Sequence, residues 1–250
     1  MAAPRAHLDK APIVEAVIDV RVLARDGLSV SDLKRATDFV GAEYTAPTPM
    51  RSLHARFGVE SGKPVLPAPV EAEMGWAFKC GSAEKPTAVA QFRTNGFTFN
   101  KLEPYTTWGE VFGEADRLWR VYVEVARPRE VTRLAVRYIN RMRRPNPGEL
   151  REYLEAAPTL PAQIPQLIQE FLTRVVVYDA ERDASVVITQ ALETPVDPGF
   201  ISVLLDIDAF RYCPLPPSDP SMPRIFETLR GLKNAIFYGS ITEKTAEMFA

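Results

Sequence analysis

A two-residue alternation of apolar and charged side chains constrains this chain more than any other feature of its sequence. In residues 133–144 one set of alternate positions holds Leu134, Val136, Tyr138, Asn140 and Met142, and the other set holds Arg133, Ala135, Arg137, Ile139 and Arg141. Successive side chains of a β-strand point to opposite faces, so this pattern predicts a strand with one arginine-rich face. Residues 13–22 alternate in the same way and predict a second strand with one buried face.

Further strand-like runs separated by turn residues fill both halves of the chain. They cover residues 52–59, 71–80, 89–94, 96–102, 172–178, 185–192 and 200–210. Asn95-Gly96, which lies between two of these runs, is a strong hairpin signal. Because hairpins join neighbouring strands in opposite directions, the sequence predicts mainly antiparallel sheets.

Helical periodicity and capping residues predict several helices between the strands. The expected helices cover residues 30–40, 108–126, 148–157, 224–235 and a short C-terminal stretch opened by Ser240 and Glu243. The helix at 108–126 carries an aromatic stripe that includes Trp108, Phe112 and Trp119. A cofactor slot built on the two tryptophans is the alternative to plain packing of this stripe on a sheet.

These elements predict an α+β fold with aromatic-rich helices packed on one side of two antiparallel meander sheets, or of one continuous sheet. Residues 1–145 and 146–250 share a plan of meander, connection and aromatic-rich helix, which suggests a pseudo-duplication. A chain of 250 residues can bury a sizeable core. We therefore expect an N-terminal and a C-terminal α+β half in one compact unit.

Composition excludes several classes of protein and supplies no site of its own. The formal net charge is −2, which gives no overall attraction to nucleic acid or to a membrane. The two cysteines, Cys80 and Cys213, have no CxxC spacing, and the two histidines, His7 and His54, are too few for common zinc sites. No apolar run is long enough to span a membrane, and the cysteines suggest no disulfide framework, so we expect a cytoplasmic protein. We also expect no cofactor.

Segments spread along the chain resemble a known family. They are Pro-Ile-Val-Glu-Ala-Val at 12–17, Arg-Tyr-Ile-Asn-Arg at 137–141, Leu-Asp-Ile-Asp at 205–208, Asn-Ala-Ile-Phe at 234–237 and Ile-Thr-Glu at 241–243. Together they look like a sporadically distributed bacterial family of uncharacterised cytoplasmic proteins of about this length. The resemblance implies a single conserved unit with an accessory role, in mobile or defence gene neighbourhoods. It implies no enzyme activity and no catalytic residue.

The arginine strip, residues 127–144, is the main candidate for binding an anion. It holds seven arginines, namely Arg127, Arg129, Arg133, Arg137, Arg141, Arg143 and Arg144, against one acid, Glu130. Guanidinium groups pair with phosphates in two-pronged contacts, so Arg133, Arg137, Arg141, Arg143 and Arg144 could bind nucleic acid or a nucleotide. The alternative is internal pairing with Glu15, Asp19, Asp206 and Asp208 on neighbouring strands. The sequence alone leaves open whether the strip faces solvent.

Asp206 and Asp208 are weak metal candidates. Residues two apart on a strand point the same way and lie about 7 Å apart, a spacing that two-metal phosphodiesterases use. Such a site would also need a third carboxylate, and Glu15 or Asp19 could supply it if their strand lies nearby.

The sequence lacks GxSxG, GxxxxGK and GxGxxG motifs, so it predicts no familiar catalytic apparatus. We therefore predict a non-catalytic interaction or regulatory protein, an accessory subunit that presents a sheet face or the proline-rich segment 214–223 to a protein partner. The alternatives are a nucleic-acid or nucleotide binder that uses the arginine strip, and a metal-dependent phosphodiesterase at Asp206 and Asp208.

Overall fold

The structure is a computed structural model that describes residues 8, 10–54, 58–60, 63–65, 70–82, 84–145, 149–193 and 199–250. Within these ranges the side chains of residues 53–54, 58–60, 63–65, 70–71 and 144–145 are not described. Predictions that concern His7 and the side chains of His54 and Arg144 therefore lie outside the described part of the chain.

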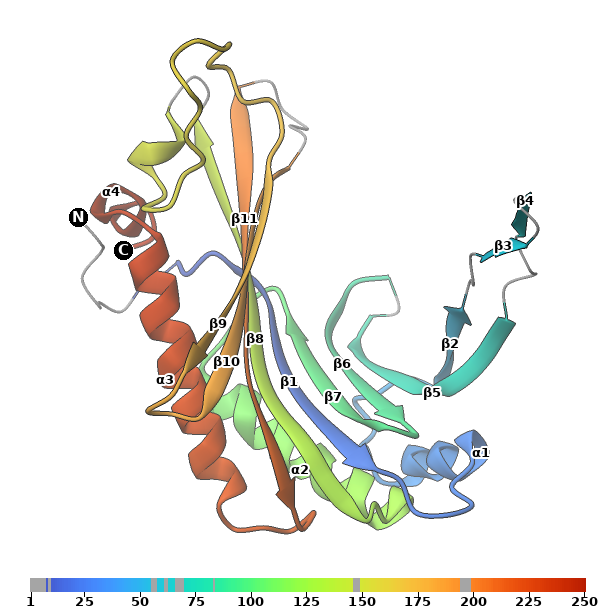
Figure 1. Ribbon diagram of the computed structural model, residues 1–250. Coiled ribbons are helices and arrows are strands. Elements are labelled where there is room, and N and C mark those ends of the chain that lie inside the picture. The colour runs from blue at the N-terminus through green and yellow to red at the C-terminus, as the bar shows by residue number, and fades with distance from the viewer. Residues whose placement is uncertain are drawn as a thin grey trace.

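Nine of the described strands form one sheet in the order β2-β5-β6-β7-β1-β8-β11-β10-β9 (Figure 1). Their bounds are β1 Ile13–Leu23, β2 Thr48–His54, β5 Val70–Gly81, β6 Pro86–Arg93, β7 Gly96–Leu102, β8 Glu130–Pro145, β9 Leu172–Asp179, β10 Ala184–Glu193 and β11 Phe200–Leu215. A separate pair is formed by β3, Gly58–Glu60, and β4, Lys63–Val65. Every neighbouring pair is antiparallel.

This architecture confirms the α+β class and the antiparallel pairing. The two halves of the chain contribute to one continuous sheet, since β8 from the N-terminal half pairs along its length with β11 from the C-terminal half. The pseudo-duplication and the division at residue 145 remain predictions.

The two long helices cover the same face of the sheet. α2, Trp108–Ala126, places Trp119 and Tyr122 against Phe97 of β7, while α3, Met222–Ser240, places Lys233 over Tyr138 of β8. Phe97 and Tyr138 lie on one face of the sheet, as the register shows. Phe97 pairs with Val20 of β1, and Ile18, two residues before Val20, pairs with Val136 of β8. Tyr138 follows Val136 by two residues. Alternate side chains share a face, so both helices lie on the side that holds the apolar positions of β1 and β8.

Strand burial follows the predicted alternation closely. Leu134, Val136, Tyr138 and Met142 are each at most 4% exposed on the face that carries the helices. α2 has the predicted bounds and begins as expected at Thr107, whose hydroxyl accepts a hydrogen bond from the Glu110 N–H. The periodicity of a long helix and of a strand buried on one face was thus sufficient to place both elements.

The first helix is shorter than predicted. Ser29 and Asp32 form the expected capping box, but the α-helix α1 covers Val30–Leu33 and a 3₁₀ turn continues over Lys34–Asp38. The Thr37 hydroxyl donates to the Lys34 carbonyl at 2.7 Å, a local side-chain bond that competes with regular helical bonding.

The helix predicted at 148–157 is wrong for the described residues 149–157. They hold a single 3₁₀ turn at Leu150–Glu152. The next residues bond to the C-terminal segment instead: the Tyr153 carbonyl accepts from the Thr242 N–H, and the Glu155 N–H donates to the Ser240 carbonyl. These long-range bonds replace the helical bonds that the local pattern suggested.

The other boundaries differ from the predictions for local reasons. The last helix, α4 at Glu243–Glu247, is capped by Thr242, because Ser240 belongs to α3 and its hydroxyl donates to the Ile236 carbonyl. β11 runs through Pro214 to Leu215, so the proline-rich connection to α3 is shorter than 214–223. The hairpin turn lies at Thr94-Asn95, because Arg93 pairs directly with Gly96.

Candidate functional site

The sheet face opposite α2 and α3 carries the charged residues singled out from the sequence. In β1 these are Glu15, Asp19 and Arg21, and Arg21 lies directly opposite Arg133 of β8. Across β8, Arg137 lies opposite Asp208 of β11. The register therefore brings the acidic strands β1 and β11 to the two sides of the arginine strip, the arrangement predicted for internal pairing.

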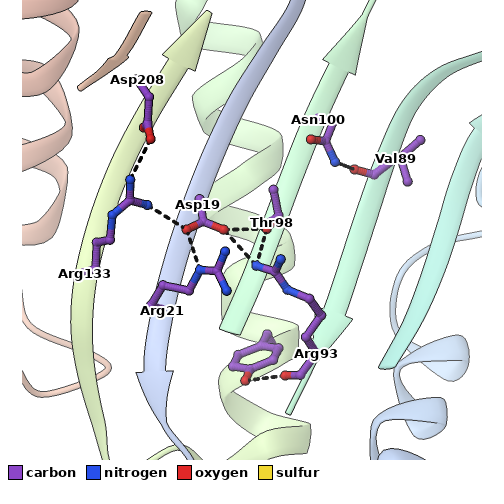
Figure 2. A network of polar contacts seen from close by, with 9 residues as sticks. Asp19, Arg21, Val89, Arg93, Thr98, Asn100, Arg133 and Asp208 are labelled. Carbon is purple, nitrogen blue, oxygen red and sulfur yellow. Dashed lines mark hydrogen bonds and ion pairs between the residues drawn. The ribbon is translucent and has the colours of Figure 1, made fainter. Parts of the chain in front are cut away.

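Asp19 is the centre of this charged face (Figure 2). Its carboxylate accepts hydrogen bonds from Arg21 at 3.0 Å, Arg93 at 2.8 Å, Thr98 at 2.7 Å and Arg133 at 3.1 Å. The residue is 8% exposed. Burial alone would raise the pKa of Asp19, but the guanidinium groups of Arg93 and Arg21 and the Thr98 hydroxyl outweigh it and hold that pKa below its usual value.

Arg133 connects Asp19 of β1 to Asp208 of β11. One end of its guanidinium donates to Asp19 and the other donates to Asp208 at 2.8 Å, while the group lies 4.3 Å from the centroid of the Phe210 ring. Burial raises the pKa of Asp208 even though Arg133 opposes that shift. Arg133 is therefore fully engaged between two carboxylates and an aromatic ring.

Arg137 and Arg141 each make a two-pronged contact with one carboxylate. Arg137 donates to both oxygens of Asp206 at 2.8 and 2.6 Å, and Arg141 donates to both oxygens of Glu193 at 2.9 and 3.2 Å. Hydrogen bonding to Asp206 raises the pKa of Arg137, whereas burial raises the pKa of the nearby Glu15. Glu193 was not among the partners predicted from the sequence. It belongs to β10, and the distance of β10 from β8 is set by the pairing of both strands with β11.

Arg143 and the two aspartates complete the set of predicted site residues. The Arg143 guanidinium lies 4.1 Å from the centroid of the Phe200 ring. Asp206 and Asp208 point the same way, as predicted, but each contacts an arginine. In the part of the chain that the structure describes, no three His, Cys, Asp or Glu side chains lie close enough together to hold a metal ion.

Arg93 and Thr98 belong to this network although sequence reasoning passed over them. They flank the hairpin turn between β6 and β7, and Arg93 is 8% exposed. The Tyr122 hydroxyl of α2 donates to the Arg93 carbonyl at 2.9 Å, which ties this corner to the helix. The available signal was an arginine at the turn end of a largely apolar strand, directly after Phe92.

A second site lies on the helix-covered side and was also missed. A cavity of about 1070 Å³ is bordered by residues 10–13, residues 103–108, β8 and α3. Lys233 of α3 lines it, is 7% exposed, and places its ammonium group 3.6 Å from the centroid of the Tyr138 ring. Burial lowers the pKa of Lys233 to about 7.

The sequence did contain a signal for Lys233. It stands four residues after Leu229 and four before Phe237, so it occupies the apolar stripe of α3. A lysine on a buried stripe is rare unless it is paired, which marks the position as unusual.

The two tryptophans considered for a shared cofactor slot lie in separate contacts. The Trp108 indole N–H donates to Glu227 and its ring stacks on Phe112, while Trp119 stacks on Tyr122. The two tryptophans thus face different neighbours and form no shared slot. Both cysteines are free thiols.

None of the helices in the described ranges is long and apolar enough to cross a membrane. No protein-family model, curated protein or solved structure matches the chain, so the resemblance to a bacterial family stays a prediction.

Proposed function

We propose that this protein is a non-catalytic interaction protein, an accessory subunit that associates by adding a β-strand to the open edge of its sheet at β9. The partner strand to which we commit is β9 of a second copy of the chain. The same proposal includes a bacterial origin and a cytoplasmic location, as the family resemblance implies.

The observation that carries this proposal is the exposure of apolar side chains along β9. Leu172, Val175, Val176, Val177 and Tyr178 are between 37% and 71% exposed. β9 is the last strand of the sheet order, so its outer backbone groups have no partner strand among the described residues. An edge strand with apolar side chains on both faces is a ready template for another strand, and proteins normally protect such edges with charges or prolines.

The sequence of β9 is self-complementary in an antiparallel pair. If Val176 lies opposite Val176 of the second copy, Val175 lies opposite its Val177, and Arg174 lies opposite its Tyr178. Two-fold symmetry repeats each contact, which places valines at the centre and an arginine next to an aromatic ring on each side. Isologous pairing of this kind produces one sheet that is continuous across both copies.

The charged face of the sheet supports a scaffold more than either alternative. Arg133, Arg137 and Arg141 already contact carboxylates, which reduces the local positive potential that nucleic-acid binding requires. Asp206 and Asp208 are held by the same guanidinium groups, and a neighbouring cation opposes the binding of a metal ion.

The association of the purified chain tests this proposal directly. Sedimentation equilibrium over a wide range of concentration should give a reversible dimer for the wild type. A lysine in the middle of β9 would place two ammonium groups opposite each other, so Val176→Lys should weaken association by about tenfold or more.

Leu23→Lys is the matched control, because Leu23 is 48% exposed and lies at the end of β1, away from the β9 edge. It should leave the association constant unchanged. A wild type that remains monomeric at the highest concentration, or a Val176→Lys variant that dimerises as the wild type does, would overturn the proposal.

A further inference from the structure

The cavity bordered by α3 and β8 differs in its charged lining from a second cavity, which α2 borders. A smaller cavity of about 380 Å³ lies between α2 and residues 217–223. Of the charged groups in its lining, Asp116 and Arg120 form an ion pair across one turn of α2, and Asp219 accepts a hydrogen bond from the Ser221 N–H. The larger cavity of about 1070 Å³ is lined instead by Lys233, whose ammonium group makes no hydrogen bond or ion pair with the residues that the structure describes.

An ammonium group without a carboxylate partner is unusual on a residue that is only 7% exposed. Buried charges in proteins are normally paired, because removal from water is costly. The contact that Lys233 makes is with the face of the Tyr138 ring, which attracts a cation but does not replace a hydrogen bond. Lys233 thus offers donors to anything that enters the cavity.

Arg230, the cationic neighbour of Lys233, already has a carboxylate partner. Arg230, one turn earlier on α3, donates to Glu227 at 3.1 Å and lies over the Trp108 ring. Its charge lowers the pKa of Lys233 after the larger effect of burial. Elsewhere in the lining, Lys10 and Lys85 outnumber Glu103, so the cavity as a whole carries an excess of positive charge.

Hydroxyl and aromatic groups complete the lining. The hydroxyls of Tyr105 and Tyr138 lie 3.2 Å apart, and the two rings meet edge to face. The amide of Asn140 donates to the Leu205 carbonyl, which fixes this wall of the cavity to β11. Trp108 and Phe237 add apolar surface.

We propose that this cavity binds a small organic carboxylate, with the carboxylate group on the Lys233 ammonium and an apolar or aromatic part against Tyr105, Trp108 and Phe237. Lys10 and Lys85 of the lining are exposed, whereas Lys233 is buried, and one buried cation matches a ligand of single negative charge. A phosphate dianion would require further buried donors, and those of Arg230 are already given to Glu227. The inference does not depend on β9.

Binding of this kind takes up a proton at neutral pH. The pKa of Lys233 in the free protein is about 7, whereas a bound carboxylate favours the charged ammonium and raises that pKa. The other charged and titratable groups of the lining are Arg230 and Tyr238 of α3, Tyr138 of β8, Glu103 and Tyr105 of the segment before α2, Lys10 and Lys85. Glu227 of α3 adjoins them through Arg230 and Trp108. Above pH 7 the affinity should therefore fall by about tenfold per pH unit.

Calorimetry with phenylacetate tests the proposal on the full chain. Phenylacetate should bind the wild type, and the uncharged phenylacetamide and phenyl phosphate should bind much more weakly. Removal of a charge-assisted hydrogen bond in Lys233→Met should weaken phenylacetate binding by about 10- to 100-fold. Lys79→Met, on β5 and outside the lining of the cavity, is the matched control and should bind as the wild type does.

A second measurement uses the wild type alone, in case Lys233→Met does not fold. Amine acylation followed by mass spectrometry should label Lys233 at neutral pH, and phenylacetate should protect it. The proposal is overturned if phenylacetate does not bind, if phenylacetamide binds equally well, if Lys233→Met binds with wild-type affinity at every pH, or if phenylacetate gives Lys233 no protection.

Discussion

Asp19 is held almost out of contact with water by three arginines and a threonine from four strands. Its side chain is 11% exposed and that of Arg93 is 9% exposed, so the contact between them is among the best shielded on the charged face. Burial of two charges is favourable only when both keep partners. Removal of Asp19 would leave the Arg93 guanidinium buried without its main counter-charge.

We expect Asp19→Ala to lower the free energy of unfolding by about 3 to 5 kcal/mol, the loss typical of breaking a buried pair from one side. Asp26→Ala is the control, because the Asp26 side chain is 91% exposed and pairs with Arg129 at 3.4 Å. That variant should change stability by less than about 0.5 kcal/mol. Chemical denaturation measures both, and equal losses would contradict the assigned role of Asp19.

The same contacts fix the direction of the pH dependence. Because the folded pKa of Asp19 is lowered, its stabilisation is present above the unfolded pKa of about 3.9 and is lost as pH falls through the folded pKa. The difference between wild type and Asp19→Ala should therefore shrink in acid.

Residue-level reasoning anticipated part of this site. The pairing of Arg133 and Arg137 with Asp19, Asp206 and Asp208 follows from alternation, since opposite charges on adjacent strands attract. The roles of Arg93 and Lys233 depend on which side chains meet across the fold, and a single sequence does not contain that information.

At the scale of elements, local signals placed β1, β8 and α2 because their patterns are long and regular. The helix expected at 148–157 failed where tertiary bonds from the C-terminal segment replaced local ones. The Asn95-Gly96 signal predicted a hairpin correctly, but the turn lies one residue earlier. Gly96 serves instead to let β7 approach β1, because a Cβ there would clash with the Val20 carbonyl oxygen.

Gly96→Ala should accordingly lower the free energy of unfolding by roughly 2 kcal/mol, through this clash and through its φ of +156°. Gly113→Ala in α2 is the matched control, since a Cβ at Gly113 meets nothing within 4 Å. It should raise stability by about 0.5 to 1 kcal/mol, because alanine is the better helix former. Thermal denaturation of both variants checks the pair, and a neutral Gly96→Ala would contradict the close approach.

At the scale of the whole molecule, the order of strands decides which surface is open. Runs of alternating residues predicted the individual strands, but pairing of β8 with β11 joins segments far apart in the sequence. That pairing extends the sheet outward through β10 and leaves β9 at the edge (Figure 1). The complete strand order, and not the sequence of β9 by itself, therefore shows that the exposed valines of β9 lie at a sheet edge.

Hydrogen exchange in β9 tests the central claim that this edge pairs with a second copy. Alternate N–H groups of an edge strand point outward, and an added strand protects them from exchange. Amides in residues 172–179 of the wild type should exchange more slowly at high protein concentration than at low concentration, and Val176→Lys should remove the difference. Exchange that is identical at both concentrations in the wild type would contradict the account.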